Sequence, residues 1–244
     1  MTARRFFIEG QRAVGNTVEI EGGDAHKIAR VLRLRAGDRI EIVDSTATAF
    51  AASVDATGRV VHARLIEVIG EHTDRRTPLT LDVAQAVPKG RRMELVVEKC
   101  TELGAGAFLP FYCERSVGRR VGEEKLARWQ RLARTAAQQC GRRDVPQVRD
   151  PKRFDELLAC FYAYSAVLFA WELAPAAPLY ELLQSALPAA GRVLVVVGPE
   201  GGFTHDEAEA ARQSGAVALS LGPRILRTDT AAIVLLAVIG ALTS

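Results

Sequence analysis

Short apolar runs alternate with segments of helical periodicity through the last two thirds of the chain, and this alternation constrains the fold most. The runs 166–171, 193–197 and 217–221 are mostly apolar, as strands buried on both faces are. Segment 91–103 instead repeats apolar residues every three or four positions, which predicts a helix. Strands that alternate with helices predict an α/β domain with a mostly parallel sheet.

Other segments of this region follow the same two patterns. Strands are expected at 79–84 and 107–112, and a helix at 125–140. Thr204 and Glu207 have the spacing of a capping box, which predicts that a further helix starts there. The apolar stretch 231–242 is too short to span a bilayer, so we expect a buried helix there and no membrane segment.

The first 72 residues have a β-rich pattern. Strands are expected at 39–43, 49–54 and 60–68, separated by turns, and one short helix with Asp24 as a possible cap lies before them. Short strands with turns between them favour a small barrel. The polar stretch 71–78 predicts a boundary between domains at 1–72 and 73–244.

Basic residues are concentrated in the middle of the chain, where 115–143 carries nine basic and two acidic side chains. Such a patch suits a phosphate backbone, although before any motif is considered a solvated helix face is the favoured explanation. The four cysteines contain no C-x-x-C pair, so no metal site is expected. We expect the cysteines to be reduced thiols. The N-terminus lacks the apolar run of a signal peptide, and the two observations together predict a cytoplasmic protein.

A glycine-rich loop, Gly198-Pro-Glu-Gly-Gly202, follows the apolar run 193–197. Ligands bind beyond the carboxyl ends of strands in open α/β sheets, and glycines let the backbone approach a ligand closely. A tight turn without a ligand remains the alternative. The loop does not match the patterns of a P-loop or a dinucleotide site, and the chain contains neither H-E-x-x-H nor G-x-S-x-G.

Two more loops follow predicted strands. Leu221-Gly-Pro-Arg-Ile-Leu-Arg-Thr228 places Arg224 and Arg227 near a carboxylate, Asp229, and an arginine pair at this edge suits an anionic partner. Thr228 or Asp229 is expected to cap the helix that follows. The third loop is Gln85-Ala-Val-Pro-Lys89-Gly-Arg-Arg-Met-Glu94. All three are expected to converge on one pocket.

The chain resembles the RsmE family of 16S ribosomal RNA N3-uridine methyltransferases, which belongs to the SPOUT class. The matching segments run in order along nearly the whole chain: Arg4-Arg5-Phe6-Phe7, His26-Lys-Ile-Ala-Arg-Val-Leu-Arg33 with Gly37-Asp38, Lys99-Cys-Thr-Glu102-Leu-Gly, Glu114-Arg115-Ser116, Gly198-Pro-Glu-Gly-Gly202 and Leu221-Gly-Pro-Arg-Ile-Leu-Arg-Thr228. The last two are the most specific.

This resemblance implies a PUA-like RNA-binding barrel followed by a parallel α/β SPOUT domain with a C-terminal trefoil knot. It implies methyl transfer from S-adenosyl-L-methionine to N3 of a uridine in 16S rRNA, within the small ribosomal subunit, by a homodimer. Another SPOUT reaction, on a 2′-hydroxyl or a guanine, and a noncatalytic RNA-binding assembly factor are the alternatives.

The resemblance also implies roles for individual residues. The cofactor would be held by Gly198, Pro199, Glu200, Gly201, Leu221, Gly222, Leu226 and Thr228, mostly through backbone groups. RNA would be bound by Arg4, Arg5, His26, Lys27, Arg30, Arg33, Arg115, Arg142 and Arg143.

Catalysis is assigned to Arg227, Asp229 and, less directly, Arg224, because a cation can stabilise the charge that develops when uridine N3 loses its proton. Two positions depart from the family pattern. Asp229 stands where glutamate is usual, and Gln138-Gln139 stands where a Glu-Gln pair is usual. The second departure removes a carboxylate, so no base is assigned at position 138.

Overall fold

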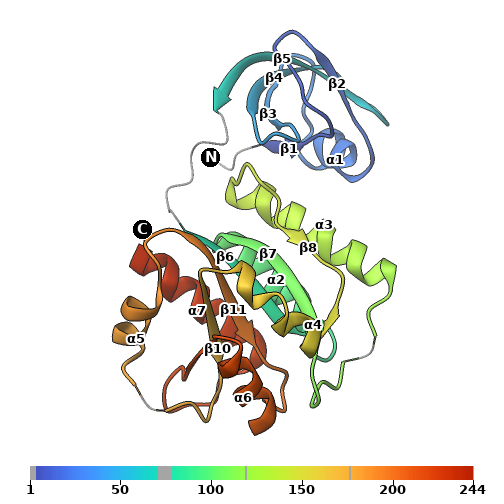
Figure 1. Ribbon diagram of the computed structural model, residues 1–244. Helices are drawn as coiled ribbons and strands as arrows, with labels where there is room; N and C mark the ends of the chain where they lie inside the picture. Colours follow the sequence, from blue (N-terminus) through green and yellow to red (C-terminus); the bar gives the residue numbers. More distant parts are fainter. Residues whose placement is uncertain (1–3, 71–78, 119, 176, 244) are drawn as a thin grey trace. The chain divides into compact units, whose positions relative to one another are not determined.

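The computed structural model describes residues 4–70, 79–118, 120–175 and 177–243. They form two compact units, and Figure 1 labels helices and strands of both. The first holds residues up to 75 together with 137–144, and the second holds 76–136 and 145–244. The predicted boundary at 71–78 lies outside the described residues, and no sequence signal indicated that 137–144 would group with the N-terminal unit.

A five-stranded sheet forms most of the N-terminal unit. Its strands are β1 (Arg5–Phe7), β2 (Thr17–Ile20), β3 (Arg39–Val43), β4 (Ala49–Ala56) and β5 (Val61–Gly70), in the order β1-β3-β4-β5-β2. β1 and β3 pair in parallel, and the other pairings of this sheet are antiparallel. Phe6, Ile28, Ile42, Phe50 and Leu65 are buried in its core. The three strands predicted in this unit are confirmed.

The helix of this unit is irregular. α1 (Gly22–His26) continues directly into a π-helical turn, Lys27–Val31, and the next residue but one, Arg33, has a left-handed φ of 53°. The prediction that Asp24 caps this helix is wrong, because Asp24 lies inside α1 and Glu21 occupies the cap position. The Asp24 carboxylate instead accepts hydrogen bonds from the Gln138 amide at 3.1 and 3.2 Å.

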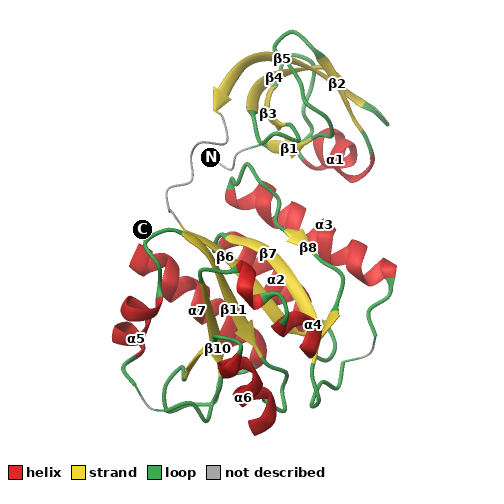
Figure 2. Ribbon diagram, viewed as in Figure 1, coloured by secondary structure: helices red, strands yellow, loops and turns green. Residues whose placement is uncertain are grey.

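The second unit contains a parallel sheet (Figure 2). Strands β6 (Leu79–Ala86), β7 (Ala105–Tyr112), β8 (Gln147–Val148), β10 (Ala166–Ala170), β11 (Gly191–Val197) and β12 (Val217–Leu219) have the order β12-β10-β11-β6-β7-β8, and β9 (Lys152–Arg153) pairs with β7. Each of these pairings is parallel. The predicted α/β class with a parallel sheet is confirmed.

Helices connect these strands: α2 (Arg92–Glu102), α3 (Glu123–Cys140), α4 (Phe154–Leu158), the 3-10 turn η2 (Phe161–Ala163), α5 (Leu179–Ala186), α6 (His205–Gln213) and α7 (Thr228–Thr243). The helices predicted from periodicity are confirmed. In the described part of the chain no helix combines the length and apolarity needed to cross a membrane. The four cysteines are free thiols.

Alternating side chains of the buried strands divide the interior between the two faces of the sheet. Val193, Val195 and Val197 belong to one core, which includes buried residues of α2, α3, α5 and α7. Leu194 and Val196 belong to the other, which includes residues of α4 and α6. With both faces covered by helices, the loops at the carboxyl edge of the strands are where a ligand can enter.

The capping box at α6 shows how local sequence shapes this edge. Thr204 Oγ1 accepts from the Glu207 backbone N–H at 3.1 Å, and the Glu207 carboxylate accepts from the Thr204 N–H at 2.9 Å. Thr204→Ala should lower the free energy of unfolding by about 1 kcal/mol, because the first turn loses a cap. Thr204→Ser keeps the hydroxyl and should stay near wild type in urea unfolding; an equal loss in both variants would contradict the capping role.

Candidate active site

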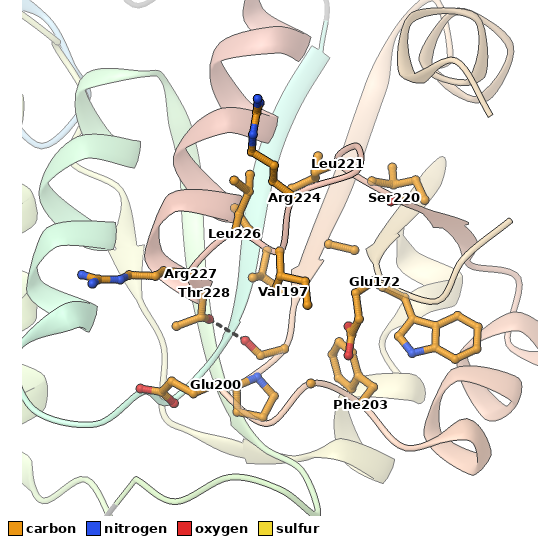
Figure 3. Close-up of a pocket in the computed structure, with 18 of the residues that line it drawn as sticks. Glu172, Val197, Glu200, Phe203, Ser220, Leu221, Arg224, Leu226, Arg227 and Thr228 are labelled. Atoms are coloured by element: carbon orange, nitrogen blue, oxygen red, sulfur yellow. Dashed lines mark hydrogen bonds between the residues drawn. The ribbon is translucent and has the colours of Figure 1, made fainter. Parts of the chain in front are cut away.

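A cavity of about 430 Å³ lies where β10, β11 and β12 end (Figure 3). Its wall is made by the last residue of each strand and the residues that follow it: 170–172 at β10, 197–200 with 202 and 203 at β11, and 219–228 at β12. The predicted convergence of loops at the carboxyl edge is therefore present, and Arg92 at the start of α2 joins the lining. A cavity of this size accommodates a small organic cofactor.

The loop after β11 comes close to its neighbours, which explains its glycines. A Cβ at Gly198 would lie 2.8 Å from the Phe203 ring, and one at Gly202 would collide with the Glu172 carboxylate. Gly202 also has a φ of +68°, in the region that favours glycine, and its N–H donates to the Pro199 carbonyl at 3.0 Å. Any side chain at these two positions would force the loop to move.

Three elements are joined under the cavity by one buried chain of hydrogen bonds. The Gln85 amide, at the end of β6, donates to the Thr228 hydroxyl at 2.7 Å. The Thr228 hydroxyl, at the start of α7, donates to the Gly198 carbonyl at the end of β11, as Figure 3 shows. Gln85 is fully buried and Thr228 is 5% exposed. Since the Thr228 oxygen accepts from Gln85, its proton is directed to Gly198.

The glycine loop is also held by side chains from two other segments. Glu200 accepts from the Lys89 N–H at 3.1 Å and from Arg92 Nη1 at 2.7 Å, which ties the loop to the start of α2. Arg115 Nη1 donates to the Gly201 carbonyl at 3.1 Å and to the Phe203 carbonyl at 3.4 Å. The loop is thus held by charged side chains as well as by the buried hydrogen bonds.

The residues predicted for the cofactor mostly line this cavity. Gly198, Pro199, Glu200, Leu221, Gly222, Leu226 and Thr228 belong to the lining, together with Arg224 and Arg227. Gly201 and Asp229 do not. Thr228 does not cap α7, because it is itself helical and its hydroxyl bonds to the glycine loop.

The three residues assigned to catalysis lie within six positions of one another but in different environments. Arg224 and Arg227 are exposed. Asp229 is only 8% exposed, and its Oδ1 has no hydrogen-bond partner among the residues that the structure describes. A buried acceptor without a partner costs free energy, so a functional role in which another group donates a hydrogen bond to Asp229 is favoured.

Sequence reasoning did not identify Trp171, Glu172, Ser220 or Phe203 as part of the cavity. Trp171 and Glu172 follow β10, and Ser220 follows β12. The rule that ligands bind beyond strand carboxyl ends could have found Glu172, which directly follows the predicted strand 166–171. It could not have found Trp171 and Ser220, because they fell inside the predicted strands 166–171 and 217–221. Phe203 carries no comparable signal, since its ring enters the cavity only through the turn at Gly202.

The residues predicted to bind RNA are distributed over both units. Arg4, His26, Arg30 and Arg33 are exposed in the N-terminal unit, and Lys27 lies 3.5 Å from Gln138 Oε1. Arg5 is 8% exposed and pairs with Glu41 at 2.6 Å and with the Gly141 carbonyl. Arg142 pairs with Asp144 at 2.6 Å. Within the described ranges no group of three metal-ligating side chains occurs.

Residues 75–240 match the model of an RNA methyltransferase domain. The chain is 34% identical over 238 residues to ribosomal RNA small subunit methyltransferase E of Bacillus subtilis, covering 93% of this chain and 92% of that protein. This chain belongs to the ribosomal RNA small subunit methyltransferase E family. A Mycobacterium tuberculosis member is 35% identical and covers all of this chain and 94% of that protein.

Solved structures agree with this family. The Neisseria gonorrhoeae methyltransferase E, bound to S-adenosyl methionine, superposes with a TM-score of 0.86 at 30% identity, and the match covers 98% of each chain. A putative methyltransferase from Legionella pneumophila, solved with the bound cofactor, gives 0.87 at 30% identity over 99% of this chain and 98% of that one. The resemblance to the RsmE family is confirmed.

The buried chain from Gln85 to Gly198 predicts a measurable loss of stability. Thr228→Val leaves the Gln85 amide and the Gly198 carbonyl without that partner, so the free energy of unfolding should fall by about 1–3 kcal/mol. Thr228→Ser keeps the hydroxyl and should lose less.

The matched control is Thr101→Val, a buried threonine of α2 whose hydroxyl donates to the Val97 carbonyl within its own helix. Urea unfolding of the three variants makes the comparison. The joining role would be refuted if Thr228→Val cost no more than Thr101→Val.

Proposed function

We propose that this protein transfers a methyl group from S-adenosyl-L-methionine to N3 of a uridine in 16S rRNA. The observation that carries the proposal is the cavity itself. It is built from Gly198–Gly202 and Leu221–Thr228, the two segments most specific to the family, at the edge where α/β sheets bind ligands.

The residues of the cavity fit S-adenosylmethionine. Glycines at 198 and 202 let the loop pack closely against Phe203 and Glu172 at the cavity, while Leu221, Leu226 and Val197 supply an apolar wall for an adenine ring. Gly198, Leu221, Gly222 and Leu226 would hold it, with Pro199 and Gly201 shaping the loop. When bound, this cofactor supplies an electrophilic methyl group on a sulfonium.

Glu200 and Thr228 would act on the cofactor indirectly. The Glu200 carboxylate is engaged by Arg92 and Lys89, and the Thr228 hydroxyl by Gly198 and Gln85. Both residues therefore set the shape of the loops, and position them for the ligand.

The protein's own residues must make uridine N3 nucleophilic, because N3 carries a proton at neutral pH. The guanidinium of Arg227, and less directly that of Arg224, would stabilise the negative charge that develops on O2 and O4 as the proton leaves. Asp229 would accept that proton or orient Arg227, since its Oδ1 has no partner among the described residues. N3 is occupied in a Watson–Crick pair, so the target must be unpaired or flipped out.

The N-terminal unit would bind the RNA as a PUA-like barrel, through Arg4, His26, Lys27, Arg30 and Arg33. Arg5 and Arg142 are engaged by Glu41 and Asp144, which favours structural roles for them. Arg115 holds the glycine loop, and Arg143 would add to the basic surface near the end of α3.

We further propose the family's C-terminal trefoil knot, formed by the segments around 198–228, and a homodimer that acts on the small ribosomal subunit. Support for the dimer comes from Ile225, an apolar side chain 87% exposed beside Arg224 on the rim of the cavity. A second copy covering this rim would remove that side chain from water.

A methyl-transfer assay tests the reaction. Small subunits lacking the modification are incubated with the protein and methyl-labelled S-adenosylmethionine, and the digested RNA is resolved into nucleosides. Label in N3-methyluridine is expected. Label in a 2′-O-methylated nucleoside or methylguanine would assign another SPOUT reaction, and cofactor binding without label, beside an active control enzyme, would assign a noncatalytic assembly factor.

Variants test the catalytic assignment. Arg227→Ala and Asp229→Asn should each lower kcat by roughly 10²-fold or more, because each removes charge stabilisation or proton transfer, while cofactor affinity by calorimetry stays close to wild type. Arg224→Ala should have a smaller effect.

Arg212→Ala is the matched control, since Arg212 is an exposed arginine on α6 paired with Glu209 and lies outside the cavity lining. Wild-type kcat in both Arg227→Ala and Asp229→Asn, with intact cofactor binding, would rule out the assignment.

A further inference from the structure

The N-terminal unit has a hollow of its own, of about 840 Å³. One wall is the helix that runs from α1 into the π-turn, and the other is the turn between β4 and β5. Gly22, His26 and Arg30 line the first wall, and Thr57, Gly58 and Arg59 line the second. We call this hollow the arginine groove. Arg59 and its turn belong to none of the segments that resemble the family.

Two cations, Arg30 and Arg59, line the groove from its two segments, and neither is paired with a carboxylate in the described part of the chain. Arg30 and Arg59 are both exposed, and neither side chain makes a hydrogen bond or ion pair within the described part of the chain. Arg5 and Arg64 of the same unit are instead paired, with Glu41 at 2.6 Å and Asp55 at 3.3 Å. Glu21 is the acidic residue of the lining. Two guanidinium forks across one groove suit phosphate oxygens.

The backbone of the groove is also open. Gly22 has a φ of +61°, and a Cβ there would meet no atom within 4 Å, so no side chain separates this backbone from an incoming group. The helix wall contains the π-turn, whose Leu32 N–H donates to the Lys27 carbonyl at 2.8 Å, and is followed by the left-handed Arg33. Both irregularities are uncommon in ordinary helices and are found often at functional sites.

We propose that the arginine groove binds the phosphodiester backbone of single-stranded RNA, with Arg30 and Arg59 contacting phosphates from opposite sides. This inference rests on the proposed function, because it assigns the substrate's backbone to a particular place on the N-terminal unit. Residues 1–75 and 137–144, which make up this unit, carry thirteen basic and twelve acidic side chains, so its net charge of +1 gives little general attraction for RNA. Local placement of unpaired arginines must therefore supply the affinity.

The test uses the full chain and the double variant Arg30→Gln/Arg59→Gln. Binding of a short fluorescent single-stranded RNA is followed by anisotropy over a range of salt concentrations. The double variant should bind about tenfold more weakly or worse, and the slope of log K against log salt should fall by about 1.4, or about 0.7 for each phosphate that is no longer neutralised. Arg64→Gln removes the same charge from the paired Arg64 on β5 and should stay near wild type.

Three further measurements separate the explanations. Cofactor affinity by calorimetry should be unchanged in the double variant, which shows that the second unit is intact. Inorganic phosphate and uridine monophosphate are titrated as competitors; if either displaces RNA at concentrations near the RNA Kd, the groove is a small-anion site and the proposal is wrong. RNA affinity and salt slope in the double variant equal to those of Arg64→Gln would also overturn it.

The groove and the reaction can fail separately. If wild type does not methylate the small subunit but the double variant still loses RNA binding, the RNA-binding role of the groove is supported and the proposed function is contradicted. If wild type methylates the small subunit and the double variant binds RNA normally, the RNA-binding role of the groove is contradicted and the proposed function is supported.

Discussion

The Thr228 hydroxyl is the contact on which the candidate site depends. It accepts from Gln85 at 2.7 Å and donates to the Gly198 carbonyl, so it joins the ends of β6 and β11 to the first turn of α7. These three elements are far apart in the sequence but carry the glycine loop, Arg227 and Asp229. Because Gln85 is fully buried and Thr228 nearly so, water competes little for these bonds, and they hold the relative positions of these groups.

Charged side chains complete this arrangement. Glu200 is bound by Arg92 and the Lys89 N–H, and Arg115 is bonded to two carbonyls of the glycine loop. A residue that a motif assigns to ligand contact can therefore act indirectly, by holding the loop that contacts the ligand. Such preorganisation suits methyl transfer, because that reaction depends mainly on the alignment of nucleophile and methyl group.

The two units have different kinds of candidate binding site. The second unit supplies a small, glycine-lined cavity whose walls are held by hydrogen bonds. The first supplies a wide groove with unpaired arginines and an irregular helix, suited to a flexible polyanion. Gln138, where the resemblance to the family leads us to expect a carboxylate, belongs to the first unit; its amide N–H group donates to Asp24 and its carbonyl oxygen accepts from Lys27. The amide of Gln138 finds an acceptor in Asp24 and a donor in Lys27. Both of its polar groups are therefore satisfied, so this position can hold a neutral side chain.

The sequence by itself determined the α/β class, the strands 39–43 and 193–197, the capping box at Thr204 and the loops that surround the cavity. Hydrophobic periodicity, capping and glycine placement are local signals. Each predicted the observed local structure because tertiary packing favours the same conformation. Only the tertiary structure decided that Thr228 joins strands instead of capping α7, that Asp229 is buried, and that 137–144 groups with the first unit. It also brought Arg59 and Arg30 into the lining of one groove, because which side chains share a cavity depends on contacts between distant segments.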